Sequence, residues 1–447
     1  MGLIQSILED DVVSCSDSEH EPTKSEIRQE ETHKLIESQK LFFMSGKTFD
    51  VDYRLSLLNK LKCLFETNIE DFSNALSGDL KCSVDILKNT HFKEVEDEFQ
   101  YIFEKLNEIK KTSSKVYDRP AGSVLILGTF TFPITACFVP AMAALAAGNV
   151  VVIKPSELAP RTARALTDTF DEAFLEDQLA VIPGDQWTAK ELLNESWDHI
   201  FFVGPHRVAK FVLSAAAQHF TPVTLELLGR SLAFILPGAD IEGAAKEIAC
   251  NKWNANALLS ESIDYVICSK EDDIHKLADL LNHEIVKSFG RNPEDSNAFK
   301  RVLNRQFYDK IENVLTKTEG DLLASPSIGY DNRSDYYIAP YIYKVEVGDI
   351  LLKEELIGPI LPIVLIEDAQ EAVDYINRNG EKPANVFLYG NDEKQVKNLQ
   401  FQIKTERLGV RTARNSVKYV EKNNLTAPTL RAGDLFERFS RRTLKHD

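Results

Sequence analysis

The first quarter of the chain repeats apolar residues with the period of an α-helix. Apolar side chains recur at spacings of three and four in residues 53–65 and again in residues 95–106. Each stretch therefore predicts a helix with one apolar face. We expect residues from about 25 to 110 to be mainly helical. The apolar faces are typical of a packed core and indicate no ligand site.

A different pattern follows, in which short apolar runs alternate with helix-like stretches. The runs at residues 123–128, 150–155 and 200–204 end in Gly or Pro and are typical of strands that a parallel sheet buries on both faces. Residues 140–147 and 163–174 lie between these runs and predict helices. The alternation predicts a doubly wound α/β sheet of the Rossmann-like class.

Ligands of doubly wound sheets bind beyond the carboxyl ends of the strands. In the predicted sheet those ends fall at Gly128, Lys154 and Gly204, so we expect a ligand site around these residues. A second α/β stretch follows from about residue 228. It predicts strands near residues 263–268 and 361–366 and helices near residues 274–286 and 304–315.

Composition narrows the class of protein. The 447 residues carry a net charge of −17, which argues against nucleic acid as a partner because phosphate contacts need clustered Lys and Arg. No uninterrupted apolar run reaches the roughly 18 residues of a transmembrane helix. The six cysteines include no Cys-x-x-Cys pair, so we expect neither a metal site nor a redox dithiol. We expect reduced, mostly buried thiols in a cytoplasmic protein.

The N-terminus combines an acidic segment with a lipidation pattern. Residues 1–24 are polar and acidic and bury too little apolar surface to offset the entropy of ordering, so we expect disorder. The start, MGLIQS, fits the pattern for N-myristoylation. Peripheral membrane attachment through a myristoylated Gly2 and a plain solvated tail both stay open, because one myristoyl chain anchors only marginally.

Four stretches together resemble the aldehyde dehydrogenase superfamily, most closely its class 3 or fatty-aldehyde branch. They are PAGSV with a following FP within residues 120–133, AAGNVVVIKPSE at 146–157, DHIFFVG with a following TPVTLEL within 198–227, and EELIGP at 354–359. The resemblance implies oxidation of aldehydes to acids with NAD or NADP. In that chemistry a cysteine thiolate attacks the aldehyde, hydride passes to the nicotinamide, and a glutamate-activated water hydrolyses the thioester.

The resemblance also implies how the chain divides. The expected parts are an acidic tail at 1–24, N-terminal helices with a Rossmann-like cofactor-binding domain at 25–227, a catalytic-type α/β domain at 228–405, and a segment at 406–447 that returns to the cofactor domain or oligomerisation region. The family's Gly-rich run near the C-terminus has no counterpart here. The region between residues 106 and 120 is also shorter than in class 3 members, so their homodimer does not carry over directly.

The resemblance places Ser260 where the family has its catalytic cysteine. The segment NALLSES at 256–262 precedes the strand predicted at 263–268, and alignment of that strand sets the register. A thiol ionises near neutral pH and is strongly nucleophilic, whereas a serine hydroxyl needs an adjacent base within hydrogen-bonding range. Neither Cys250 nor Cys268 lies in the right register.

Two further catalytic positions matter. Thr131 stands where the family has the asparagine of its oxyanion hole, and loss of one such donor typically lowers a rate by about 10²–10³. Glu226 matches the family's general base, but Leu228 follows it where the family has glycine. Both a catalytic role and a structural role as a hydrogen-bond acceptor remain open for Glu226, and we favour the structural role.

The positions that hold the cofactor are partly retained. Lys154 and Glu157 match family residues that bind the adenosine ribose, and Glu355 matches the glutamate on the nicotinamide ribose. Ile357 replaces an aromatic ring that faces the nicotinamide. Gly204 is retained, but the Pro that follows it removes a backbone N–H near the pyrophosphate. We therefore expect weakened binding of NAD or NADP.

These departures affect one site while the core strands are kept. We favour a catalytically impaired member, a pseudoenzyme that acts by binding a nucleotide, a protein partner or an active paralogue. One alternative is an active NAD(P)-dependent oxidoreductase that converts an aldehyde to a carboxylic acid by altered chemistry. Another is a weak esterase that uses Ser260.

Overall fold

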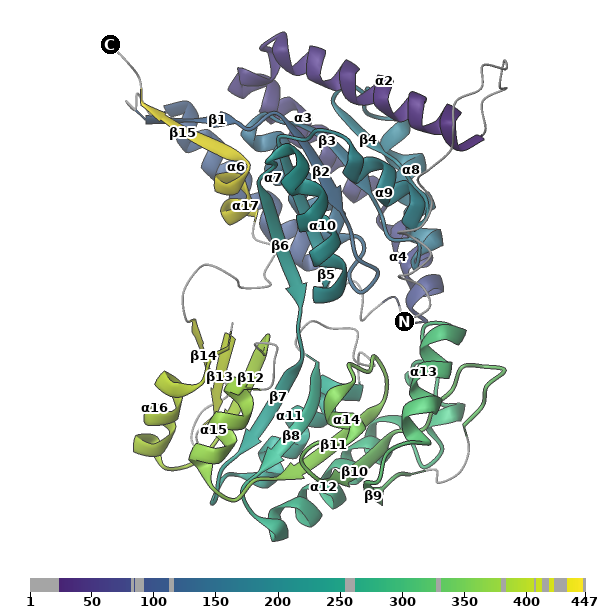
Figure 1. The fold of residues 1–447 in the computed structure, drawn as a ribbon, viewed down its shortest axis with the longest axis vertical. Helices are drawn as coiled ribbons and strands as arrows, with labels where there is room; N and C mark the ends of the chain where they lie inside the picture. Colours follow the sequence, from purple (N-terminus) through teal and green to yellow (C-terminus); the bar gives the residue numbers. More distant parts are fainter. Residues whose placement is uncertain are drawn as a thin grey trace, which may run out of the picture.

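Two α/β units make up the molecule, joined where strand β6 (Val223–Leu228) runs on into strand β7 (Ser231–Ile235) (Figure 1). The computed structural model describes residues 24–81, 84, 92–111, 116–253, 262–326, 331–378, 383–405, 407–411, 418–421 and 432–444. The expected disorder of the tail, the Gly2 lipidation site and Ser260 lie outside the described residues. The division of the chain at residues 24, 227 and 405 stays a prediction.

The first unit opens with helices, as the apolar period predicts. They are α2 (Lys24–Met44), the 3₁₀ turn η1 (Lys47–Phe49), α3 (Val51–Thr67), α4 (Ile69–Leu80) and α6 (Lys93–Lys111). Asp50 caps α3 by accepting a hydrogen bond from the backbone N–H of Asp52. Leu57, Leu61 and Phe65 of the predicted stripe are buried, which confirms that this face of α3 belongs to the core.

The first sheet is fully parallel, with the strand order β4-β3-β2-β5-β6. Its strands besides β6 are β2 (Ser123–Leu127), β3 (Val150–Lys154), β4 (Leu179–Val181) and β5 (His199–Pro205). Its helices are α7 (Thr135–Ala147), α8 (Pro160–Asp171), α9 (Gln186–Asn194), α10 (His206–His219) and α17 (Ala432–Arg438). The predicted doubly wound α/β fold is therefore confirmed.

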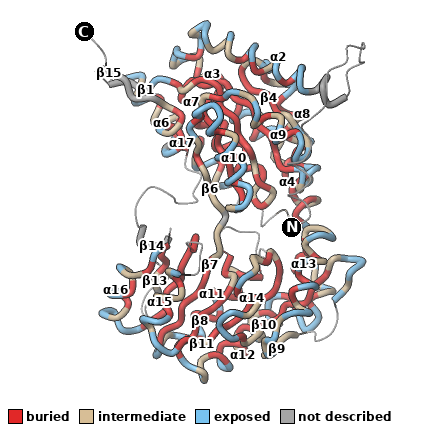
Figure 2. The backbone as a smooth tube through the Cα atoms, viewed as in Figure 1, coloured by how far each residue is buried: buried red, intermediate tan, exposed pale blue. Residues whose placement is uncertain are grey.

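Helices cover both faces of this sheet. The apolar residues of α7, α8 and α17 pack on one face together with those of α3 and α6, while those of α2, α9 and α10 pack on the other. The central strands are consequently buried along their whole length (red in Figure 2). Polar groups can reach a ligand only beyond the strand ends.

The second sheet has the strand order β14-β13-β12-β7-β8-β11-β10-β9 and is parallel except at its two ends. Its further strands are β8 (Ile263–Cys268), β9 (Asp321–Ala324), β10 (Tyr341–Val345), β11 (Ile360–Leu365), β12 (Asn385–Tyr389), β13 (Arg407–Arg411) and β14 (Lys418–Glu421). Its helical segments are α11 (Ile241–Trp253), α12 (Glu271–Phe289), η3 (Pro293–Asp295), α13 (Arg305–Leu315), α14 (Ile350–Lys353), α15 (Ala369–Arg378) and α16 (Glu393–Gln402). The predicted strands and helices of this stretch are confirmed.

A two-stranded ribbon brings the end of the chain back to the first unit. Strand β1 (Val116–Pro120) pairs antiparallel with β15 (Ser440–Leu444). Helix α17, which comes directly before β15, packs against α6 and α7. Figure 1 shows the ribbon projecting from the upper unit beside these helices.

Two local predictions are wrong. Helix α7 begins at Thr135 and contains Pro140, whereas the sequence pattern started the helix at the proline. All residues of α7 are buried, so tertiary packing outweighs the local preference against proline. Cys137 and Cys268 are buried as expected, but Cys63 and Cys250 are exposed, because each lies on the outward face of its helix.

Asn149 links the first sheet to the C-terminal helix, and we expect its removal to destabilise the protein. Its amide donates to the carbonyl oxygens of Ala144 and Phe439 at 2.9 and 3.1 Å, and its Oδ1 accepts from the N–H of Gly122 at 2.9 Å. Asn149→Ala leaves buried polar groups without these partners and should lower the free energy of unfolding by about 2–4 kcal/mol.

Urea denaturation measures this effect, with Asn59→Ala as the matched control. Asn59 donates to the carbonyl oxygen of Leu55 on an exposed helix surface, so its removal should change the free energy of unfolding by less than about 0.5 kcal/mol. Equal losses in the two variants would contradict the linking role of Asn149.

Candidate functional site

Three neighbouring strand ends form the predicted ligand edge of the first sheet. Gly128 follows β2, Lys154 ends β3 and Gly204 lies near the end of β5, with β2 in the middle. The backbone N–H of Gly128 donates to the carbonyl oxygen of Lys154 at 3.0 Å. A Cβ on Gly128 would lie 3.0 Å from the sulfur of Cys137, so glycine allows the close approach of this loop to α7.

Lys154 and Glu157 form an ion pair at this edge. The Nζ of Lys154 donates to the Oε2 of Glu157 at 2.6 Å. The Lys154 side chain is 5% exposed and the Glu157 side chain 45%, so the pair extends from the sheet to the surface. An ammonium beside a carboxylate presents donors and acceptors together, which is the combination that neighbouring sugar hydroxyls require.

Helix α10 begins directly beyond β5. Pro205 is its N-cap residue, with extended backbone angles, and the helix itself starts at His206. Proline therefore removes no N–H from the first helical turn, and the structure gives no support to the prediction that this proline weakens a phosphate site here. A Cβ on Gly204 would lie 2.5 Å from the ring of Phe202, so this position also requires glycine. Ala209 is buried against the sheet.

Glu226 lies on the edge strand β6 and pairs with the C-terminal helix. Its Oε1 lies 3.7 Å from the Nη1 of Arg438, and the side chains are 7% and 30% exposed respectively. The two charged groups form an ion pair between β6 and α17. Arg438 gives no signal in the sequence, because nothing in one chain shows which strand the last helix meets.

His199 on β5 belongs to the same buried cluster. Its Nε2 lies 2.8 Å from the hydroxyl oxygen of Thr224, and its ring packs edge-on against Phe439 with centroids 5.0 Å apart. Burial, and to a smaller extent the charge of Arg438, lowers the pKa of His199 from 6.5 to about 4. The imidazole is consequently neutral at pH 7.

Thr131, the predicted oxyanion position, lies in the loop after β2. Its side chain is buried, and its hydroxyl oxygen lies 3.3 Å from that of Thr129. Either hydroxyl can donate in this contact. A hydroxyl that also bonds a neighbour is a poorer preorganised donor than a fixed amide.

Glu355 lies on the loop between α14 and β11, which is held by three side chains. Lys310 donates to the carbonyl oxygen of Glu355 at 2.7 Å, and Trp253 Nε1 donates to that of Pro359 at 3.1 Å. Arg230, just after β6, donates to two carbonyl oxygens at the end of α14. The loop is therefore fixed to α11, to α13 and to the connection between the two units.

Arg230 also forms a charged group with Lys252 and Asp264, which the sequence analysis did not identify. Its guanidinium lies 4.7 Å from the ring centroid of Tyr265. Burial lowers the pKa of Lys252 from 10.5 to about 8, against the attraction of Asp264. The only sequence signal is a lysine on an otherwise apolar helix face.

The two buried cysteines offer no thiolate. Burial raises the pKa of Cys137 to about 12 and also raises that of Cys268.

Among the described residues, no group of His, Cys, Asp or Glu side chains is arranged to hold a metal ion. In the same part of the chain, no helix is long and apolar enough to cross a membrane.

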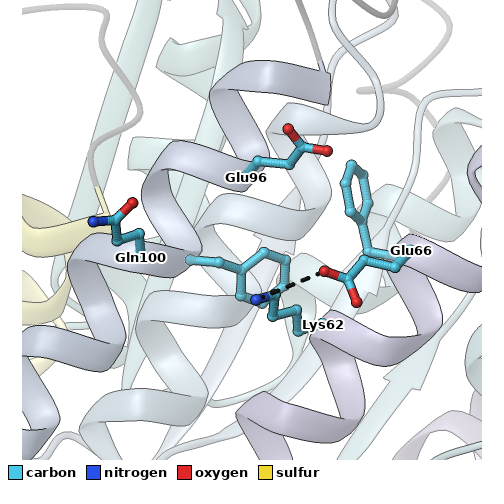
Figure 3. A pocket seen from close by; sticks show the side chains of 6 residues that line it. Lys62, Glu66, Glu96 and Gln100 are labelled. Carbon is cyan, nitrogen blue, oxygen red and sulfur yellow. Dashed lines mark ion pairs between the residues drawn. The ribbon is translucent and has the colours of Figure 1, made fainter.

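A cavity of about 440 Å³ on the surface of α3 and α6 contains none of the predicted site residues (Figure 3). Its lining consists of Lys62, Phe65, Glu66, Glu96, Phe99 and Gln100. The two phenylalanine rings in this lining are buried, and the Nζ of Lys62 lies 3.6 Å from a carboxylate oxygen of Glu66. The cavity is separate from the sheet edge.

The depressed pKa of His199 predicts loss of stability in acid. The unfolded state binds a proton near pH 6.5 and the folded state only near pH 4, so stability falls as the pH drops through this window. Between pH 7 and 5, the free energy of unfolding should fall by about 2 kcal/mol more in the native protein than in His199→Gln. Urea denaturation at both pH values measures this difference. The exposed His219 is the control, and equal behaviour of His199→Gln and His219→Gln would contradict the prediction.

Comparisons with known proteins show the family of this chain. The family model described as "Aldehyde dehydrogenase family" matches residues 9–419. A dimeric NADP-preferring aldehyde dehydrogenase of Canis lupus familiaris is 30% identical over 381 residues, which cover 82% of this chain and 82% of that protein. Aldehyde dehydrogenase family 3 member A2 of Pongo abelii is 32% identical over 371 residues, covering 80% of this chain and 75% of the relative.

Solved structures show the same fold. A substrate-bound AldH of Staphylococcus aureus superposes with a TM-score of 0.82 at 24% identity, covering 92% of this chain and 93% of its own. An aldehyde dehydrogenase of Mycobacterium tuberculosis in complex with NAD+ gives a TM-score of 0.76 at 19% identity, covering 91% and 88%. With a family match over most of its length, and relatives about 30% identical over four-fifths of it, this chain belongs to the aldehyde dehydrogenase family.

Proposed function

We propose that this protein is a nucleotide-binding member of the family that binds NAD or NADP weakly and does not oxidise aldehydes at an enzymatic rate. The observation that carries this proposal is the ion pair between Glu226, at the position of the family's base, and Arg438. Its physiological role would then be binding, to a nucleotide and to a protein partner or active paralogue.

The ion pair opposes the step that the family's glutamate performs. A general base must lie within hydrogen-bonding reach of the water from which it takes a proton. The guanidinium of Arg438 lies 3.7 Å from the Oε1 of Glu226, on a side of the carboxylate from which a water could otherwise approach. The hydrolytic half of the reaction is therefore disfavoured in this arrangement.

The reacting end of the site is weakened at two further positions. Ser260 offers a neutral hydroxyl at the nucleophile position, and Thr131 bonds Thr129 where the family has an amide donor. Each change alone lowers catalytic power. The serine affects nucleophilic attack on the aldehyde, the threonine affects stabilisation of the oxyanion, and the pairing of Glu226 affects hydrolysis of the covalent intermediate.

Nucleotide binding is supported by the opposite end of the site. The Lys154–Glu157 pair stands at the sheet edge where ligands of doubly wound folds bind. Two aldehyde dehydrogenases of similar fold are described in complex with NAD+, and the Canis relative is described as NADP-preferring. These descriptions support a nicotinamide dinucleotide as the class of ligand.

An active dehydrogenase remains the second candidate. Its support is the identity of about 30% to relatives that are named as aldehyde dehydrogenases. A Ser260 esterase is a third, since a serine hydroxyl can form an ester if a base activates it.

Three variants test the proposal through NADH or NADPH formation at 340 nm, with short and long aldehydes. The native protein should show no rate above the background, and Ser260→Cys alone should restore little. Adding Thr131→Asn should raise the rate by about 10²–10³ over Ser260→Cys, because it returns one oxyanion donor. Adding Arg438→Ala should raise it further by freeing Glu226.

Ser260→Ala is the control for both alternatives. A robust native rate that disappears in Ser260→Ala would overturn the proposal in favour of serine chemistry. Native hydrolysis of a simple phenyl ester that is lost in the same variant would favour the esterase. Calorimetric titration with NAD and NADP tests binding separately, and binding should disappear in Lys154→Met.

A further inference from the structure

Helix α13 joins the two units through an aromatic contact. It lies at the part of the second unit next to the first (Figure 1), and Asn304 caps it by accepting from the N–H of Phe307 at 3.2 Å. Phe307 packs against the core of the second unit, and its ring centroid lies 5.4 Å from that of Phe130. Phe130 in turn packs against the core of the first unit.

Two more side chains from the second unit reach the same core. Leu303, just before α13, and Ile357, on the loop between α14 and β11, both pack against the first unit's core. We name Phe130, Leu303, Phe307 and Ile357 the apolar seam. All four are half-buried, so their contact removes apolar surface from water and favours closure of the two units.

The seam joins the loops that carry the two residues predicted for the reacting end. Phe130 comes directly before Thr131, and Ile357 comes two residues after Glu355. The family resemblance puts Thr131 at the oxyanion position and Glu355 at the nicotinamide ribose. Apolar side chains from both loops are instead engaged with protein, and Ile357 has no π face against which a nicotinamide ring could stack.

The loop that carries Glu355 has little freedom to move away. Lys310 of α13 lies 3.2 Å from the carboxylate of Glu354, in addition to its hydrogen bond with the carbonyl oxygen of Glu355. A Cβ on Gly358 would lie 2.5 Å from the side chain of Ile311, also on α13. The same helix therefore supplies a seam ring and fixes the Glu355 loop.

The residues predicted for the adenosine end differ from the apolar seam in position, exposure and polarity. Lys154 and Glu157 lie on and just after β3, outside the seam, and the Glu157 side chain is 45% exposed. Their ion pair can rearrange toward sugar hydroxyls without separating the two units. The residues predicted for one end of the dinucleotide site are thus polar and reach the surface through Glu157, whereas the loops predicted for the other end carry the apolar seam.

We propose that the apolar seam takes the place of the nicotinamide half, so that the ligand of this protein is an adenine mononucleotide of the AMP or ADP kind. The inference rests on the proposed function and narrows it, since NAD would then bind only through its adenosine half. A dinucleotide must open the seam to place its second half, whereas a mononucleotide need not.

Calorimetric titration of the full chain with AMP, ADP, NAD and nicotinamide mononucleotide tests this. We expect AMP and NAD to bind with dissociation constants within about threefold of each other, and nicotinamide mononucleotide not to bind. Phe307→Ala and Phe307→Leu remove the ring contact with Phe130. In both variants NAD should gain at least about fivefold in affinity relative to AMP, while AMP affinity is unchanged.

Leu315→Ala is the matched control, because Leu315 lies on the same helix and packs against the core of its own unit. Its ratio of AMP to NAD affinity should equal that of the native protein. Native binding of NAD more than about tenfold tighter than AMP would overturn the inference and leave the proposed function standing. An unchanged ratio in both Phe307 variants would also overturn it. Binding of neither nucleotide would overturn the proposed function itself.

Discussion

Burial of Phe436 and Phe439 against the first core determines where the end of the chain lies, and the arrangement of the site depends on it. Both rings are fully buried, and the carbonyl oxygen of Phe439 accepts a hydrogen bond from Asn149. Because α17 is fixed there, its last residue, Arg438, lies against Glu226 on the edge strand. An apolar contact thus sets the electrostatics of a predicted catalytic group.

The two ends of the predicted dinucleotide site are built from different parts of the fold. The adenosine end is made by the strand end and loop of Lys154 and Glu157, within the first unit alone. The residues predicted for the reacting end lie on loops of both units, and the rings of Phe130 and Phe307 meet between those units. The Lys154–Glu157 ion pair therefore does not depend on the contact between Phe130 and Phe307.

The local parts of this structure follow from the sequence, and the long-range contacts do not. Uninterrupted apolar runs predict β2, β3 and β5, because a parallel sheet buries such strands on both faces. The start of α7 could not be predicted, since packing overrides the local effect of Pro140. The pairing of Arg438 with Glu226 joins residues far apart in the chain, which one sequence cannot reveal. The roles of the predicted site residues stay predictions, and Ser260 lies outside the described residues.

The most direct test of the proposed function is a pre-steady-state burst measurement with the native protein. The protein, saturated with NAD, is mixed rapidly with a large excess of aldehyde, and reduced nicotinamide is counted per polypeptide in the first turnover. Such an experiment separates hydride transfer from later hydrolysis and product release. The proposed function predicts no burst of reduced nicotinamide while NAD stays bound. A burst that approaches one equivalent per chain would contradict it, because the reacting end would then be intact.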